Sequence, residues 1–277
     1  MNIQLSKRMQ AVADMVIPGF CVADIGCDHG FVSIYLIQNQ IAPHVFAADV
    51  RPGPLSRAKE HIEQAGLLQY ITPVLSDGLQ NVPVNEKQAD QAAKADVCTG
   101  AQAIVAAGIG GRLTVKILGD WPKKTEALSY MVLEPQSDIH IVRQWLLENG
   151  FCILRENMVF EDGKYYPILF AANTSEKKWQ EEIDRTRQQY LDGKQKWEAL
   201  GYDPDVWQQN CDLYGMQLII SGHEVLKTYL AHSMEKDSEL LNSMEKAQSN
   251  ERLQQRIQEI RSRQLCSKQL LSFMEKQ

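Results

Sequence analysis

The stretch VADIGCDHGFVSIYL, residues 22–36, contains two acids and a histidine within six consecutive positions. Asp24 closes an apolar run, and Asp28 and His29 follow after a few small or polar residues. A packed core avoids such groups, because an unpaired buried carboxylate is costly. The pattern therefore predicts a ligand-binding loop at a strand end, in which Gly26 lets the chain turn sharply beside a ligand.

This loop lacks the glycine pattern GxGxxG of a dinucleotide-binding turn, although Gly30 is positioned to open the next helix. Acidic side chains also suit a pyrophosphate badly, because phosphate prefers backbone N–H groups at a helix N-terminus. Carboxylates suit a ligand that is cationic or rich in hydroxyl groups.

Two further acids follow later apolar runs: Asp49 ends the second, and Asp77 follows the third in the segment SDGL. S-adenosyl-L-methionine offers a matching set of groups, namely a sulfonium, an ammonium, a ribose diol and an adenine amino group. Each acid alone could be a helix cap or a turn residue. Acids at three successive strand ends predict together a site for S-adenosyl-L-methionine.

Short apolar runs alternate with stretches of helical spacing up to about residue 173. We expect strands over residues 20–25, 44–49, 71–75, 103–109, 130–135 and 165–172, and helices over residues 30–39, 54–66, 111–121 and 138–150. Such alternation predicts an α/β fold with a Rossmann-like parallel sheet and helices on both faces. Ligands of such sheets bind beyond the carboxyl ends of the strands. The polar connection over residues 81–100 is long, and predicts either a mobile lid or a short extra helix.

The sequence pattern changes near residue 175, and we expect two domains, 1–174 and 175–277. Apolar residues recur at heptad spacing over residues 179–200 and again over 253–274, which predicts an antiparallel helical hairpin or coiled coil. From residue 252 onward six basic residues oppose two acids, and residues 185–196 carry four basic residues and one acid. If the two segments lie side by side, their basic residues could form a stripe that binds nucleic acid. The alternative is that these residues are a solvated face of a coiled coil, and that the tail is only a stabilising appendage.

The 277 residues carry a net charge of −6, so a nucleic acid would have to be held by a local patch. The six cysteines form no CxxC pair, which predicts reduced thiols and no metal site. The N-terminus lacks a hydrophobic signal core, and no apolar run approaches membrane-spanning length. We therefore expect a cytoplasmic protein without membrane contact, and a monomer.

The fourth expected strand runs into the segment AAGIGGR, residues 106–112. Enzymes that methylate amino groups usually carry a polar Asp/Asn-Pro-Pro-aromatic motif here, whereas Ala107, Gly108, Gly110 and Gly111 offer only backbone groups. A ring nitrogen with a free lone pair, such as adenine N1, needs placement rather than a strong base. Such placement can lower a barrier by roughly 7–11 kcal/mol.

Seven segments in the same order resemble the bacterial tRNA (adenine-22-N1)-methyltransferases: LSKRM, VADIGCDHGF, RPGPLSRAKEHI, SDGL, AAGIGGRL, LEPQSDIHIVRQWLLENGF and EDGKYYPI. The resemblance covers nearly the whole chain, and implies a class I methyltransferase domain, a coiled-coil-like C-terminal domain that binds tRNA, and S-adenosyl-L-methionine as cofactor. Two departures stand out: Asp49 occupies a position where Glu is common, and the connection before the fourth strand is long.

The resemblance also implies which residues line the sites. The implied cofactor-binding residues are Asp24, Gly26, Asp28, His29, Gly30, Asp49, Val50, Asp77, Gly78 and Ala107. The residues implied to place the substrate are Asp28, Gly108, Gly110, Gly111 and Tyr166.

Several interpretations stay open at this point. His29 could orient Asp28, approach the base or cap the loop; Tyr166 could stack on the adenine or pack in a strand; Arg143 could form a surface salt bridge. A methyltransferase acting on a small molecule or protein, and a binding protein without turnover, are alternative functions.

Overall fold

The computed structural model describes residues 3–85, 98–244 and 251–276, and the chain divides into two compact units, Met1–Asp184 and Arg185–Gln277. The division falls ten residues after the expected boundary at residue 174, because Trp179 and Ile183 pack into the core of the first unit. Among the described residues, no helix is both long and apolar enough to cross a membrane.

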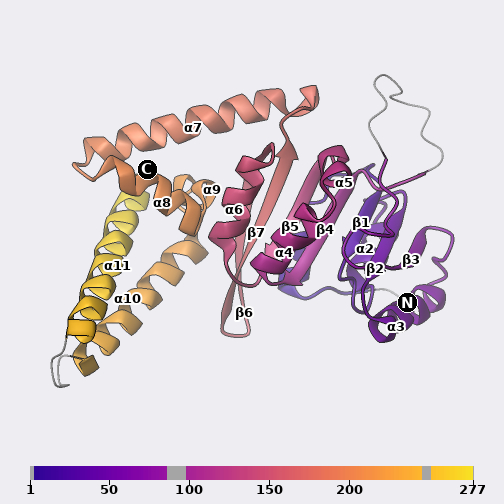
Figure 1. The fold of residues 1–277 in the computed structure, drawn as a ribbon, viewed down its shortest axis with the longest axis horizontal. Coiled ribbons are helices and arrows are strands. Elements are labelled where there is room, and N and C mark those ends of the chain that lie inside the picture. Colours follow the sequence, from indigo (N-terminus) through magenta and orange to yellow (C-terminus); the bar gives the residue numbers. More distant parts are fainter. Residues whose placement is uncertain (1–2, 86–97, 245–250, 277) are drawn as a thin grey trace. The chain divides into compact units, whose positions relative to one another are not determined.

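A seven-stranded sheet forms the centre of the first unit, in the order β3-β2-β1-β4-β5-β7-β6 (Figure 1). Its strands are β1 (Val22–Ile25), β2 (Val45–Asp49), β3 (Ile71–Leu75), β4 (Ala103–Ile109), β5 (Tyr130–Pro135), β6 (Phe151–Glu161) and β7 (Lys164–Asn173). The first five strands are parallel, as expected. The Rossmann-like sheet is confirmed, with an antiparallel edge in which β7 pairs with β5 and with β6, a strand that the sequence pattern did not reveal.

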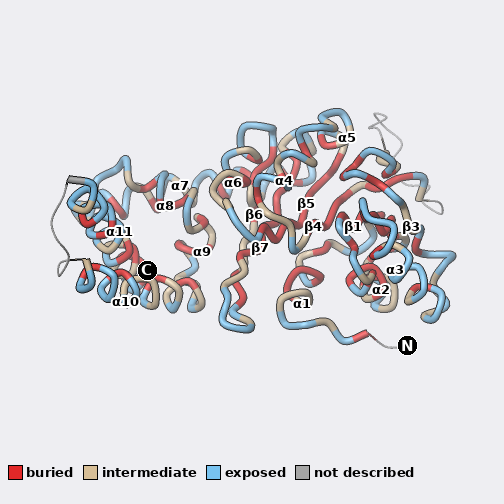
Figure 2. The backbone as a smooth tube through the Cα atoms, turned by 60° about the horizontal axis from the view of Figure 1, so that its bottom comes forward, coloured by how far each residue is buried: buried red, intermediate tan, exposed pale blue. Residues whose placement is uncertain are grey.

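Alternate residues of each strand face two separate hydrophobic cores. Val22 and Val45 belong to one core, and their neighbours Ala23 and Phe46 to the other. This alternation buries both faces of β1, β2, β4 and β5 along most of their length (Figure 2), whereas the edge strand β3 is buried at Ile71 and exposed at Thr72 and Leu75.

Six helices cover the two faces of the sheet. One face carries α1 (Lys7–Ala13), α2 (Phe31–Gln38) and α3 (Pro52–Gln64), and the other α4 (Gly111–Gly119), α5 (Pro122–Ala127) and α6 (Ile139–Glu148). Figure 1 labels α2 to α6, and Figure 2 labels α1. The four expected helices are confirmed as α2, α3, α4 and α6, whereas α1 and α5 were not expected. The unit ends with the 3-10 turn η1 (Lys177–Trp179) and the start of α7 (Gln180–Ala199).

The connection between β3 and β4 can be followed only at its ends. Val84 forms a parallel bridge with Ala101, two residues before the start of β4. The expected lid or extra helix falls largely on residues 86–97, which lie outside the described residues. Cys98 forms a disulfide with Cys21, so the expectation that all six cysteines are reduced is wrong for this pair.

The second unit is helical, as expected, and contains the rest of α7 with α8 (Pro204–Tyr214), α9 (Met216–Ile220), α10 (Glu224–Met244) and α11 (Glu251–Glu275). Its hairpin joins α11 to α10 through Leu241, Ile257 and Ile260, whereas residues 179–200 meet α11 near its end, where the ring centroids of Trp197 and Phe273 lie 5.6 Å apart. Arg263 accordingly bonds to Asp237 on α10. The expected basic stripe is therefore weakened, because an acid of α10 neutralises one of its members.

Candidate functional site

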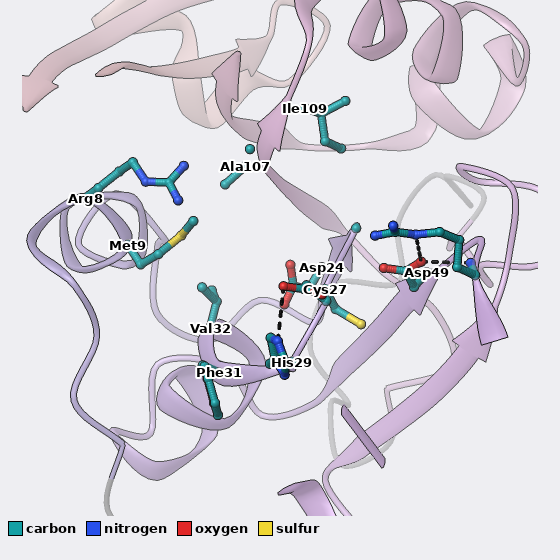
Figure 3. A pocket seen from close by; sticks show the side chains of 14 residues that line it. Arg8, Met9, Asp24, Cys27, His29, Phe31, Val32, Asp49, Ala107 and Ile109 are labelled. Carbon is teal, nitrogen blue, oxygen red and sulfur yellow. Dashed lines mark hydrogen bonds and ion pairs between the residues drawn. The ribbon is translucent and has the colours of Figure 1, made fainter. Parts of the chain in front are cut away.

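A cavity of about 420 Å³ opens at the carboxyl ends of β1, β2 and β4. Four segments line it: the start of α1, the turn from β1 into α2, the end of β2 with the residues after it, and the end of β4 (Figure 3). This is the edge of the sheet at which the sequence predicted a ligand. Seven of the predicted site residues line the cavity: Asp24, Gly26, Asp28, His29, Asp49, Ala107 and Gly108.

Asp24 is a buried acid of the cavity lining, with 5% of the residue exposed. The Ser33 hydroxyl, on the first turns of α2, donates a 2.7 Å hydrogen bond to its Oδ2. Burial nevertheless outweighs this bond and raises the pKa of Asp24 to about 6, with a smaller contribution from the nearby Asp49. A buried carboxylate of this kind favours a cationic ligand, whose charge would offset the desolvation.

Asp49 stands at the end of β2 and is also 5% exposed. Its Oδ1 accepts a 2.8 Å hydrogen bond from the backbone N–H of Arg51, which leaves the second carboxylate oxygen available for a hydroxyl group. The β1 turn is fixed against β2, because the N–H groups of Gly26 and Cys27 both donate to the carbonyl oxygen of Ala48.

Gly26 has a φ of +76°, a conformation that favours glycine. A Cβ at this position would lie 3.3 Å from Cδ1 of Ile109, a residue of β4 that also lines the cavity. The glycine therefore lets the turn pass close to the end of β4.

His29 lies at the rim of the cavity, where its Nε2 is 3.6 Å from Oδ2 of Asp28. Its ring stacks on Phe31 at a centroid distance of 5.5 Å, and its carbonyl oxygen is 2.9 Å from Nδ1 of His61. The structure thus favours the interpretation that His29 orders the loop and faces Asp28. Asp28 itself has a φ of +48°, a strained conformation for a non-glycine residue.

The end of β4 carries a bulge at Gly108, where the register with β5 shifts between Ala107 and Ile109. Gly108 has a φ of +76°, and its N–H donates a 2.8 Å hydrogen bond to Oε2 of Glu134 on β5. The same carboxylate oxygen is 2.9 Å from Nη1 of Arg8, on α1. The bulge exposes Gly108 to the cavity while a buried acid satisfies its N–H.

Gly110 and Gly111 lie beyond the cavity lining, at the start of α4. A Cβ on Gly111 would overlap the carbonyl oxygen of Ser137, and one on Gly110 would lie 3.3 Å from the Ser137 hydroxyl. These two glycines are explained by backbone packing, and their contact with a base stays a prediction.

Five other predicted residues also lie outside the lining: Gly30, Val50, Asp77, Gly78 and Tyr166. Gly30 precedes α2 with a φ of +72°, and a Cβ on Gly78 would overlap Ile117. Tyr166 is separated from the cavity by Arg8, whose guanidinium carbon lies 4.8 Å from the ring centroid. Arg143 is buried and pairs with Glu156 at 2.9 Å, so it forms an internal ion pair and not the solvent-facing one considered above.

Sequence reasoning missed Arg8 and Glu134. A signal for each was present: Arg8 belongs to the segment LSKRM, and Glu134 is an acid in the otherwise apolar run YMVLEP. Within the described ranges, no group of three or more His, Cys, Asp or Glu side chains is arranged to hold a metal ion.

Comparisons with known proteins give the site a context. Residues 5–169 match the family model described as a methyltransferase domain. The tRNA (adenine(22)-N(1))-methyltransferase of Bacillus subtilis (strain 168) is 32% identical over 170 residues, which cover 61% of this chain and 66% of the relative. The matched region thus spans slightly less than two thirds of that relative's length.

Solved structures support the same fold over nearly the full length. The crystal structure of the Bacillus subtilis tRNA methyltransferase TrmK has a TM-score of 0.74 and 24% identity, covering 98% of this chain and 100% of that chain. A Streptococcus pneumoniae protein solved in complex with S-adenosyl-L-methionine has a TM-score of 0.71 and 24% identity, covering 97% and 100%. With residues 5–169 matched by the family model and the cavity at the expected strand ends, the chain belongs to the methyltransferase domain family.

Proposed function

We propose that this protein transfers a methyl group from S-adenosyl-L-methionine to N1 of adenosine 22 in tRNA. The observation that carries the proposal is the pair of buried acids, Asp24 and Asp49, at neighbouring strand ends of one cavity. The named activity of the Bacillus subtilis relative supports the choice of substrate. A tRNA substrate implies that the protein works in the cytoplasm.

The cavity residues fit this cofactor. Asp24 is a buried carboxylate whose raised pKa makes a cationic partner favourable, and Asp49 retains a free oxygen that can accept a ribose hydroxyl. We expect Asp77 and Gly78, in the turn after β3, to border the adenine. When bound, S-adenosyl-L-methionine supplies an electrophilic methyl group on a sulfonium.

The end of β4 supports a ring nitrogen as the acceptor of the methyl group. Ala107 and Gly108 bring only backbone atoms to the cavity, and the Gly108 N–H is already bonded to Glu134. Adenine N1 needs no base to remove a proton, so placement alone suffices there, and placement can contribute roughly 7–11 kcal/mol.

We further propose that the helical unit, Arg185–Gln277, helps to hold tRNA. A target base must be extruded from the folded RNA at a cost of a few kcal/mol, so contacts remote from the cavity are needed. The basic residues of α7 and α11 are the candidates, reduced by the pairing of Arg263 with Asp237.

One experiment tests the proposal directly. The purified chain is incubated with unmodified tRNA and cofactor labelled in its methyl group, and the modified nucleoside is then mapped. We expect label at adenosine 22 and conversion of the cofactor to S-adenosylhomocysteine. Label only in protein or small molecules would indicate a different substrate, and cofactor binding without conversion would indicate a protein without turnover.

A further inference from the structure

Glu134 is a fully buried acid at the centre of the first unit, with 0% of the residue exposed. Burial raises the pKa of its carboxyl group, against the opposing effects of Arg8 and of its hydrogen-bond donors. Those donors are the Gly108 N–H at 2.8 Å, Nη1 of Arg8 at 2.9 Å, and Nε2 of Gln136 at 2.9 Å and 3.3 Å from the two carboxylate oxygens. A carboxylate in this position is held by a specific set of partners.

The sheet explains why an acid is needed there. In the register of β4 with β5, Ala107 is opposite Glu134 and Ile109 is opposite Pro135, so Gly108 is left without a backbone partner. The Gly108 N–H is a donor that needs an acceptor from outside the backbone ladder, because an N–H without a hydrogen-bond partner is costly. The Glu134 carboxylate takes the Gly108 N–H and fixes the bulge that faces the cavity.

Arg8 is the cation that this buried acid requires. Its guanidinium bonds to Glu134 through Nη1 and lies over the ring of Tyr166, with 4.8 Å between the guanidinium carbon and the ring centroid. Its backbone N–H donates to Oε1 of Glu161, which fastens the start of α1 to β6. Two sides of the side chain are thus fixed by the protein.

The remaining side of Arg8 lines the cavity, and its side chain extends from α1 toward Ala107 (Figure 3). Its Nε and Nη2 atoms have no hydrogen-bond partner within the described parts of the chain. A planar, fixed guanidinium beside the bulge of β4 can both stack on a nucleobase and donate hydrogen bonds to it.

We propose that Arg8 contacts the base that accepts the methyl group, and that Glu134 positions Arg8 and Gly108 for this contact. The inference rests on the proposed function and deepens it, because it names the surface that receives the base. Arg8 is thereby a substrate-contacting residue, and Glu134 is a positioning residue.

The charge balance of the reaction gives Glu134 a second effect. The lone pair of the base nitrogen forms the new N–C bond, the C–S bond breaks with its electron pair left on sulfur, and no proton moves. Positive charge passes from the sulfonium to the base, and an unpaired guanidinium beside the base would oppose this transfer. Glu134 neutralises Arg8, so the surface offered to the base is flat but carries no net charge.

The chain contains a matched control for this arrangement. Arg155 on β6 bonds to Glu182 at 2.9 Å, and its guanidinium carbon lies 4.7 Å from the Phe170 ring centroid. Arg155 therefore has an Arg–Glu ion pair and a ring contact of the same kinds as Arg8, although its partner Glu182 is more exposed than Glu134, and it does not line the cavity. A substitution at Arg155 therefore measures the effect of losing such an ion pair without any loss of contact with the base.

The test compares Arg8→Lys with Arg155→Lys in the full chain, by tRNA methylation kinetics, cofactor titration and thermal unfolding. Lysine keeps the charge but loses the planar fork, so we expect Arg8→Lys to lower kcat about tenfold or more, the scale of losing a base-stacking surface. We expect the cofactor Kd to stay within about twofold, and Arg155→Lys to leave kcat unchanged. A merely structural ion pair would be rescued by lysine, so wild-type kcat in Arg8→Lys would overturn the inference.

Glu134→Gln tests the positioning part, with Glu182→Gln as its control. Glutamine can still accept the Gly108 N–H but leaves Arg8 unneutralised, so we expect kcat to fall while the control is unaffected. Adding Arg8→Met to Glu134→Gln removes the unpaired cation, so the double variant should lose less than the product of the two single losses. Strictly multiplicative losses would refute the coupling. If the wild-type chain methylates no tRNA, the proposed function itself fails, which is distinct from an active wild type with an active Arg8→Lys.

Discussion

Replacing Asp24 by asparagine is expected to stabilise the ligand-free protein at pH 7 and to weaken its binding of S-adenosyl-L-methionine. Burial raises the pKa of this carboxyl group from 3.8 to about 6. A shift of that size corresponds to about 3 kcal/mol of cost for keeping the carboxylate charged in the folded chain. Asparagine has nearly the same shape without the charge, and the shifted pKa already includes the opposing effect of the hydrogen bonds from Ser33. The gain is therefore up to about 3 kcal/mol in the free energy of unfolding.

The pH dependence gives this prediction a distinctive sign. Because the pKa of Asp24 is higher in the folded than in the unfolded chain, the folded chain holds the proton to a higher pH. The contribution of this group to stability is thus fully present below pH 3.8 and is lost as the pH rises to about 6. Asp24→Asn should lack this decline. Cofactor binding should behave oppositely in the wild type, weakening as the pH falls below about 6, because a protonated Asp24 cannot offset a cation.

Urea unfolding from pH 4.5 to pH 8, with and without cofactor, together with calorimetric titration, measures both effects. Asp14→Asn serves as the control, because Asp14 is an exposed acid at the end of α1, away from the cavity lining. We expect Asp24→Asn to raise the urea midpoint at pH 7 and the control to leave it unchanged. An Asp24→Asn protein that is less stable than the wild type at pH 7, or that binds cofactor with an unchanged Kd, would refute the reasoning.

Three further predictions follow from the site and the fold. Asp49→Ala should weaken cofactor binding by roughly 1.5–3 kcal/mol, the worth of a hydrogen bond to a charged group, and an unchanged Kd by calorimetry would remove Asp49 from the site. The product should be N1-methyladenosine and not N6-methyladenosine, which nucleoside chromatography coupled to mass spectrometry distinguishes; a dominant N6 product contradicts the proposed placement. A chain truncated after Asp184 keeps Trp179 and Ile183 in the core, so it should fold and bind cofactor. Its affinity for tRNA should be lower, and that affinity should depend less steeply on salt concentration. Equal methylation by the truncated and full chains would show that the helical unit is only an appendage.

Much of the first unit could be predicted from the sequence because its signals are local. An apolar run that is buried on both faces needs no alternation, and a turn that begins with Gly26 follows directly from the strand before it. Asp24 and Asp49 were found for the same reason, because each stands at the end of such a run. Parallel strands then bring their carboxyl ends to one edge, and both acids line one cavity there.

Three features depended on pairing between distant segments. Strand β6 has mixed burial, so its pattern does not stand out until β7 pairs with it. The helical hairpin joins α10 to α11, a choice made by contacts such as Arg263 with Asp237 and not by the heptad spacing within each helix. The disulfide between Cys21 and Cys98 spans 77 residues, and no spacing rule predicts it.

The sequence by itself thus determined the alternation of strands and helices, the acids at the strand ends and the family that those motifs indicate. Only the tertiary structure decided what surrounds them. Arg8 and Glu134 are 126 residues apart, and they meet because the register of β5 places Glu134 beside the bulge, where its carboxylate accepts the Gly108 N–H that the shifted register leaves out of the ladder. A local pattern records whether a residue is buried, but the partner that a buried charge requires is set by strand order and register, which exist only in the folded chain.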